Sequence, residues 1–306
     1  MHSTHVYGGL AHVELDGDAF DFGHGVYLHR TYAHLMSPYL MAFSPAPPGG
    51  HHPPPWRAAK GGFSFDIEVE LCVPTTEALP GGFSPDDTIW WIAALLRLAR
   101  YPFLIVPVIA NQPFSQAASS EDEPLLRPFE IETRVLRATE PEGRKLDPVD
   151  LDWVKREWSA GARLMQRNPK FRSAIRALDV CTVQGRTSSS LLAVWGGLEQ
   201  LFLPSQAELR FRVSSHIAAY LEPPGPKRLA LYKTMLELYK KRSKAAHTAD
   251  EIDPGALIQS YVVLRNALVK MIDTDSVPTQ ADLETLLFCA NEPSSTSGAS
   301  SDATPA

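Results

Sequence analysis

Two kinds of hydrophobic pattern divide the chain. In the first half, short runs alternate between apolar and polar residues, most clearly from Phe63 to Val73, as in a half-buried strand. From about residue 147 onward, apolar residues instead recur every three or four positions, as on one face of a helix. The pattern predicts an α+β protein, with a mixed β/α domain over 1–143 followed by an all-α helical bundle over 147–290.

The first half is predicted to contain several short elements joined by turns. Residues 5–32 are predicted to be β-rich, because their apolar runs are separated by Gly-Asp and Gly-His-Gly turn signals. Residues 44–62 hold too much Pro and Gly for regular structure, which predicts a loop. The further predicted elements are a helix over 85–98, a buried strand over 103–110, a polar acidic loop over 115–123 and an alternating strand over 129–136.

The second half is predicted to be helical almost throughout. Asp147-Pro148 is a typical helix start, and the Pro223–Pro226 segment separates two later helices. The predicted helices cover residues 147–167, 169–180, 188–203, 205–221, 226–246, 254–272 and 281–290. Short connections between long amphipathic helices predict an antiparallel bundle. The tail over 291–306 is rich in Ser, Thr, Pro and Ala and is predicted to be disordered.

Composition favours a protein of the cytoplasm. The 306 residues are 44% hydrophobic and 21% charged, as in ordinary globular proteins, and the chain is long enough for two domains. Three widely spaced cysteines form no disulfide framework, which favours a reducing compartment. No signal peptide is evident at the start, and the most apolar window, 89–110, is broken by arginines and prolines. We therefore expect a cytoplasmic protein without a membrane span.

The net charge of −6 conceals a difference between the halves. Residues 1–146 hold 10 Lys and Arg against 17 Asp and Glu, whereas residues 147–290 hold 19 against 16. Within the second half, Lys155–Arg176 and Lys227–Lys244 each hold seven basic residues and a single acid. A polyanion such as RNA would be drawn to these two stretches, although solvated helix faces explain the same charges.

Other candidate residues in the first half are more simply explained by structure. Histidines at 24, 29, 34, 51 and 52 lack carboxylate or Cys partners at ligand spacing, so no metal site and no cofactor are expected. Asp66, Glu68 and Glu70 are expected to share the solvent face of the strand over 63–73. Trp90 and Trp91 are expected to pack into the core rather than to stack on bases.

The most informative stretch is the helix end from Leu236 to His247, which holds Arg242 and His247. A permanent guanidinium and an imidazole that titrates near neutral pH are the groups that phosphodiester cleavage needs. Five residues of helix place the two side chains about 140° apart. They can meet at one phosphate if the arginine reaches around the helix, or if a second copy of the helix packs alongside. The alternative is a solvated helix terminus, where basic residues favour the negative dipole end.

Two motifs in the second half resemble the HEPN superfamily, and most closely its ApeA-like branch. One is the segment Trp195-Gly-Gly-Leu-Glu199-Gln-Leu-Phe, and the other is Tyr239-Lys-Lys-Arg242-Ser243-Lys-Ala-Ala-His247. The resemblance covers about residues 147–290 and implies a HEPN-like helical bundle that is often dimeric. Active members of this superfamily cleave RNA without a metal, commonly as toxins or in anti-phage defence.

The resemblance assigns expected roles to individual residues. Arg242 and His247 would be the catalytic pair. Apart from the resemblance, Glu199 lies in an apolar helix stretch, where it could orient Arg242 or His247 from a facing helix; the alternative is a charge on the exposed side of an amphipathic helix. The candidate RNA contacts beside this pair are Lys240, Lys241, Ser243 and Lys244, with solvated surface as the alternative explanation of the lysines. Ser243 stands where Asn, Asp or His is commonest, so a non-catalytic HEPN module for dimerisation or nucleic-acid binding is the alternative function. The expected partners are RNA, a second copy of the chain through the C-terminal helices, and a ligand or protein recognised by the N-terminal sensing domain.

Overall fold

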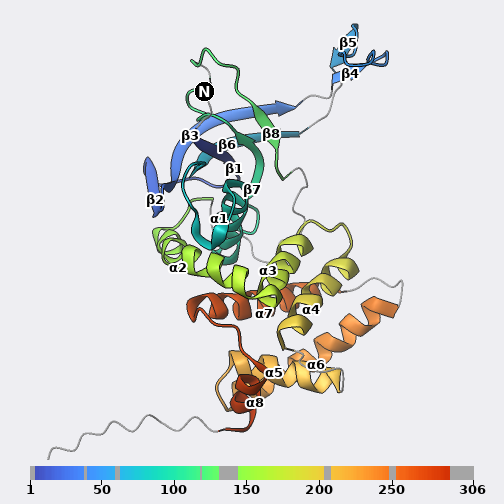
Figure 1. Cartoon of the computed structure of the whole chain (residues 1–306). Helices are drawn as coiled ribbons and strands as arrows, with labels where there is room; N and C mark the ends of the chain where they lie inside the picture. The colour runs from blue at the N-terminus through green and yellow to red at the C-terminus, as the bar shows by residue number, and fades with distance from the viewer. Residues whose placement is uncertain are drawn as a thin grey trace, which may run out of the picture.

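A computed structural model describes residues 4–37, 40–58, 63–117, 119–130, 144–202, 208–247 and 253–289. A β-sheet with one helix against it lies at one end, and the remaining helices are stacked beneath it (Figure 1). The predicted α+β class, with a β-rich first part and a helical second part, is therefore confirmed. None of the described helices is long and apolar enough to cross a membrane.

The main sheet has the strand order β2-β3-β6-β1-β7-β8, and every pairing between neighbouring strands is antiparallel. Its strands are β1 (His5–Ala11), β2 (Ala19–Gly23), β3 (Val26–Ser37), β6 (Phe63–Pro74), β7 (Ile105–Ala110) and β8 (Leu126–Pro128). The strand predicted over 63–73 is confirmed as β6, at the centre of this sheet. The predicted strand over 103–110 is confirmed as β7, and the β-rich character of 5–32 is confirmed by β1 to β3.

Two short pairings were not predicted. β4 (Leu40–Ala42) and β5 (Trp56–Ala58) form a separate two-stranded hairpin that stands away from the main sheet (Figure 1). The prediction of loop throughout 44–62 is therefore wrong at residues 56–58, which pair through their backbone with a distant segment. β8 was also missed, because three residues are too few to show a period. The predicted strand over 129–136 falls mostly outside the described residues, as do the tail over 291–306 and residues 203–207.

Helix α1 (Pro85–Ala99) covers one face of the main sheet. Ser84 caps it by accepting a hydrogen bond from the Asp87 backbone, and Pro85 occupies the first turn, where its missing N–H costs nothing. Every residue from Thr88 to Ala99 is buried, which shows that this part of the helix is covered on all sides. Trp90 and Trp91 both lie in the core, as predicted.

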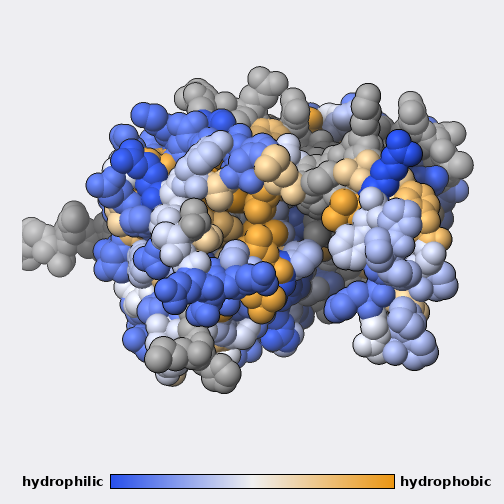
Figure 2. Space-filling model, turned by 90° about the horizontal axis from the view of Figure 1, so that it is seen from above, coloured by the Kyte–Doolittle hydropathy of each residue, from blue (hydrophilic) through white to orange (hydrophobic). Residues whose placement is uncertain are grey.

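The sheet end of the molecule is mostly hydrophilic at its surface but carries an apolar band (Figure 2).

The predicted helices of the second half are confirmed with small changes at their ends. They are α2 (Pro148–Arg167), α3 (Pro169–Cys181), α4 (Thr187–Phe202), α5 (Leu209–Leu221), α6 (Pro226–His247), α7 (Pro254–Asp273) and α8 (Gln280–Phe288). Asp147, Asn168, Asp253 and Thr279 cap four of them through side-chain oxygens. Helix α4 packs against α3, α6 and α7, while α5 packs against α6 and α8.

The hydrophobic core continues from the sheet into the helices. A single cluster of buried side chains runs from Leu10 on β1 to Leu283 on α8. Two indoles connect its parts, since Trp91 Nε1 donates to the Trp158 carbonyl and Trp158 Nε1 donates to the Phe22 carbonyl, both at 2.9 Å. The predicted boundary between residues 143 and 147 is therefore a change of secondary structure across which packing is maintained.

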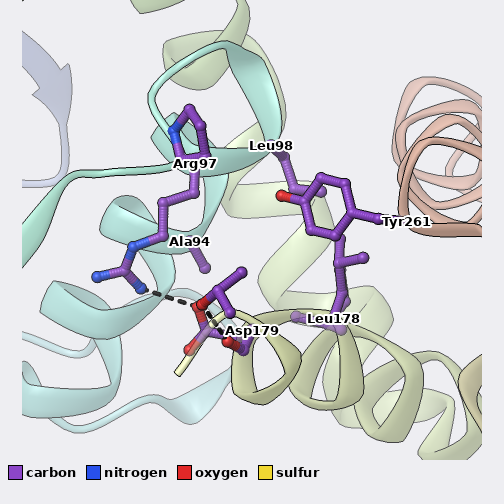
Figure 3. A pocket seen from close by; sticks show the side chains of 9 residues that line it. Ala94, Arg97, Leu98, Leu178, Asp179 and Tyr261 are labelled. Atoms are coloured by element: carbon purple, nitrogen blue, oxygen red, sulfur yellow. Dashed lines mark hydrogen bonds and ion pairs between the residues drawn. The ribbon is translucent and has the colours of Figure 1, made fainter. Parts of the chain in front are cut away.

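A buried arginine joins α1 to the helical half. The Arg97 side chain is 5% exposed and donates to both carboxylate oxygens of Glu130. It also donates to Asp179 on α3 at 3.0 Å (Figure 3). Burial by itself would lower the pKa of Arg97, but Asp179 and Glu130 more than reverse this and raise it. The adjoining cavity is only about 20 Å³, the space of one water molecule, so this is a structural contact rather than a ligand site.

Candidate functional site

The candidate site lies where α4 packs against α6. Helix α6 begins with Pro226 at its first position and is rich in Leu, Ala and Lys, which favour helices. Its buried side chains are Met235, Leu238 and Ala245, so these mark the face that packs against the rest of the bundle. Arg242 follows Met235 by seven residues and Leu238 by four, which places it on that same inner face.

Arg242 pairs with Glu199 of α4. Arg242 Nη2 donates to Glu199 Oε2 at 3.0 Å, and Arg242 Nε lies 3.0 Å from Glu199 Oε1. The second approach is a close ion pair without the alignment of a hydrogen bond, since neither atom has a hydrogen-bond partner. The side chains are only 25% and 21% exposed, so the pair is largely shielded from water. Of the two partners that the sequence left open for Glu199, the structure selects Arg242.

Two aromatic side chains, Tyr239 and Trp195, pack beside the Glu199–Arg242 pair. The Arg242 guanidinium lies 5.8 Å from the centre of the Tyr239 ring, one turn earlier on α6. Tyr239 meets Trp195 of α4 edge-on, with ring centres 5.3 Å apart and planes at 87°. Trp195 is fully buried and its indole donates to Ser260 of α7 at 3.1 Å. The contact of Tyr239 with Arg242 was not predicted from the sequence, although their three-residue spacing was a signal for it.

The geometry leaves one edge of the Arg242 guanidinium open. Nε and Nη2 form one edge of the planar group, and this edge faces Glu199. The other edge is formed by Nη1 and the second hydrogen of Nη2, and within the described residues Nη1 makes no hydrogen bond. A guanidinium offers five donors in fixed directions, so it can hold a carboxylate on one edge and a phosphate on the other.

His247 is the last residue of α6 and is exposed to solvent. Its ring has no hydrogen bond or ion pair to any part of the chain that the structure describes. Because α6 is continuous from Arg242 to His247, the two residues are about 7.5 Å apart along the axis and about 140° apart around it. The structure thus brings Glu199 to Arg242, and it leaves His247 on a different face of the helix.

The lysines predicted to contact RNA are partly neutralised by neighbours. Lys240 Nζ donates to Glu237 at 2.6 Å, and Lys241 Nζ donates to Asp253 at the start of α7 at 2.9 Å. These hydrogen bonds lower the pKa of both carboxyl groups. Both pairs are exposed, so phosphate and water compete readily for the lysines. Ser243 is partly buried and Lys244 is exposed.

The candidates in the first half have structural explanations. Within the described ranges, no three His, Cys, Asp or Glu side chains are grouped so that they could hold a metal. The prediction that Glu70 lies on a solvent face is wrong, because its side chain is 3% exposed. Asp66 is exposed and Glu68 is partly exposed, as predicted.

Comparisons with models of protein families, with curated proteins and with solved structures found no match to this chain.

Proposed function

We propose that this chain is a metal-independent, HEPN-type endoribonuclease of the cytoplasm in which Arg242 and His247 act on the RNA phosphate. The observation that carries the proposal is the shielded Glu199–Arg242 pair between the two helices that hold the HEPN-like motifs. An arginine fixed by a carboxylate and an aromatic ring, with one edge open, is preorganised for a phosphate. Such preorganisation is what distinguishes a candidate site from a mobile surface arginine.

The chemistry needs these two side chains, the substrate and a proton donor for the leaving oxygen. His247 takes the proton from a ribose 2′-hydroxyl, whose oxygen attacks the adjacent phosphorus. The bond from phosphorus to the 5′ oxygen breaks, which leaves a 2′,3′-cyclic phosphate on one product. A proton donor, namely water or a second imidazole, returns a proton to the 5′ oxygen of the other product. The open edge of Arg242 binds the non-bridging phosphate oxygens as negative charge accumulates on them. DNA lacks the attacking hydroxyl and is not cleaved by this route.

A second copy of the chain completes the proposed site. Within one chain His247 lies about 140° around α6 from Arg242, which is a poor arrangement for one phosphate. Two copies related by a two-fold axis through the C-terminal helices would place His247 of one copy near Arg242 of the other. We therefore propose a homodimer as the active form, with the N-terminal sheet serving recognition of a trigger.

The test is cleavage of single-stranded RNA by the full chain in the presence of EDTA, beside growth of cells that express it. His247→Ala and Arg242→Ala are each expected to lose nearly all cleavage and toxicity, since the two groups act as a unit. The products are expected to carry a 2′,3′-cyclic phosphate. A single 2′-deoxy substitution at the cut site is expected to block cleavage there.

Thr234→Ala is the matched control, because Thr234 is exposed on the same helix and, among the described residues, its hydroxyl donates only to the Ala230 carbonyl one turn earlier. It is expected to behave as the wild type. If His247→Ala cleaves RNA and arrests growth as the wild type does, the nuclease proposal is wrong. Light scattering of the full chain tests the assembly, and a monomer that still cleaves RNA would contradict the two-copy site.

One observation favours a second candidate function, a non-catalytic HEPN module that dimerises or binds nucleic acid. Arg242 is already engaged by Glu199, and His247 lies away from it. In that function the basic stretch of α6 binds RNA without cutting it, with affinity that falls steeply as salt rises. Reversing Lys240 and Lys241 to Glu would then weaken binding, whereas His247→Ala would leave both binding and cell growth unchanged.

A further inference from the structure

A straight stripe of side chains runs along the outer face of α6 and ends at His247. Leu229, Leu236, Lys240 and His247 are spaced by seven, four and seven residues, so they lie within about 40° of one another around the axis. Lys240 and His247 are exposed, Leu229 is 54% exposed and Leu236 is partly buried. From Leu236 to His247 the stripe is about 16 Å long, a distance that a short stretch of extended RNA strand covers.

At Leu236 the stripe borders an open groove. Leu236 and the first turn of α5 line it, with a volume of about 680 Å³; the lining residues are Glu208, Leu209, Arg210, Phe211 and Leu236. Helices α5 and α6 lie side by side here (Figure 1). Phe211 is 52% exposed, although a phenylalanine is normally buried. It meets Tyr232 of α6 edge-on, with ring centres 6.1 Å apart and planes at 79°, so one of its faces is held in a fixed direction.

Two cations lie at or near this groove: Arg210 is part of its lining, and Lys240 follows Leu236 by one turn of α6. Glu237 is positioned between Arg210, at 4.0 Å, and Lys240, at 2.6 Å, and so holds one cation from each helix beside the groove. Glu237 is also the only acidic residue in the segment Lys227–Lys244, which holds seven basic residues. An exposed ring flanked by two cations is the arrangement with which proteins hold an unpaired base and its phosphates.

We propose that the groove between α5 and α6 binds one unpaired base of a single-stranded RNA on Phe211, with its flanking phosphates on Arg210 and Lys240. The strand then follows the stripe along α6 to His247. This inference rests on the proposed function and adds to it a binding site for the substrate strand. The groove selects single-stranded RNA, because a base that is paired within an RNA duplex cannot present its face to the Phe211 ring. Glu237 is displaced from Lys240 when phosphate binds, so it opposes binding.

The test is the affinity of the full chain for a short fluorescein-labelled oligouridine, measured by anisotropy in EDTA with His247→Ala as the background, so that no cleavage interferes. Phe211→Leu keeps an apolar side chain but removes the aromatic face, and it is expected to weaken binding about tenfold. Phe211→Trp is expected to bind at least as tightly as the background. Glu237→Gln is expected to tighten binding several-fold, because it removes the charge that competes with phosphate.

Tyr32→Leu is the matched control, because Tyr32 is 67% exposed on β3, in the sheet. It is expected to leave the affinity unchanged. Affinity that is the same for Phe211→Leu and the background, with both folded by circular dichroism, overturns the proposal. Equal affinity for a duplex of the same length also overturns it. If Phe211→Leu weakens RNA binding but the wild-type chain does not cleave RNA, the groove proposal is supported and the nuclease proposal is wrong. If His247 governs cleavage but Phe211 does not affect affinity, only the groove fails.

Discussion

Glu70 shows how one local irregularity changes the environment of a side chain. The register of β6 against both β1 and β3 shifts at Glu68, so the alternation of faces reverses there. Glu70 consequently lies on the opposite face from the one that strict alternation predicts relative to Asp66. It is covered by the loop after β7, where the Phe114 backbone donates to its Oε2 at 2.8 Å. Burial raises the pKa of Glu70, and the hydrogen bond from Phe114 and the nearby His29 offset only part of this rise.

The raised pKa of Glu70 predicts a pH dependence of stability. The native state binds this proton more readily than the unfolded state, so the free energy of unfolding falls as pH rises from the ordinary value of 4.5 through the raised pKa. Glu70→Gln keeps an oxygen for the Phe114 N–H but has no charge to bury. As pH rises from about 4 to 7, the free energy of unfolding of this variant is therefore expected to increase relative to that of the wild type, as measured by urea unfolding.

Asp66→Asn is a control of opposite sign for that experiment. Asp66 is exposed, and the hydrogen bond from His34 lowers its pKa, so its contribution is present at neutral pH and lost as pH falls. As pH rises over the same range, the free energy of unfolding of Asp66→Asn is therefore expected to decrease relative to that of the wild type. If Glu70→Gln also loses stability toward pH 7, the account of Glu70 is wrong.

At the scale of elements, the two adjacent glycines of α4 have different surroundings. A Cβ at Gly196 would meet nothing within 4 Å, whereas one at Gly197 would lie 3.0 Å from Leu264 of α7 and 3.4 Å from the Ala174 backbone of α3. Gly197 therefore allows α4 to pack closely between α3 and α7, and this packing fixes the position of Glu199 two residues later. Position 196 can therefore accept any residue that favours helices.

The two glycines provide a matched pair of substitutions. Gly196→Ala is expected to raise the free energy of unfolding by up to about 1 kcal/mol, because alanine loses less backbone entropy in a helix. Gly197→Val is expected to lower it by about 1–3 kcal/mol, because its methyl groups would press on the α3 backbone. Thermal unfolding followed by circular dichroism measures both. Equal effects of the two substitutions would show that α4 is not closely packed at Gly197.

The elements also show what the sequence could predict and what it could not. The ends of the helices were predicted closely, because caps such as Asp147 with Pro148 and Asp253 with Pro254 are local signals. The short strands β5 and β8 were missed, since only pairing with distant residues makes them strands. In the candidate site, the sequence identified Glu199 and Arg242 separately but left the choice of partner open. That choice depends on how α4 packs against α6, which no local pattern records.

At the scale of the whole molecule, Arg97 ties the sheet to the helices. Its guanidinium neutralises Glu130, which also accepts from the Val106 backbone of β7, and Asp179, which also accepts from the Trp90 indole. Two carboxylates at 15% and 16% exposure therefore depend on one buried cation. Removing one member of such a buried group leaves uncompensated charge in a place that water reaches poorly.

Arg97→Met is therefore expected to lower the free energy of unfolding by about 3–5 kcal/mol. Hydrogen exchange is expected to increase together in β7 and in the last turn of α3, because the same cation holds both. Arg100→Met is the control, since Arg100 is 55% exposed although it pairs with Asp147 and Asp150. Its cost is expected to stay within about 1 kcal/mol. Comparable losses for the two variants would contradict the account of Arg97 as the buried cation that both halves require.

The indoles of Trp91 and Trp158 have a consequence for how the chain can be divided. Each donates its hydrogen bond across the junction between the β-rich and helical halves, inside one continuous core. A backbone cut between residues 130 and 144 would leave two fragments, each exposing apolar surface shaped to fit the other. The protein is therefore expected to work as a split protein: its two fragments would regain the fold only when they meet, and their reassembly would report that two fused partners have come together.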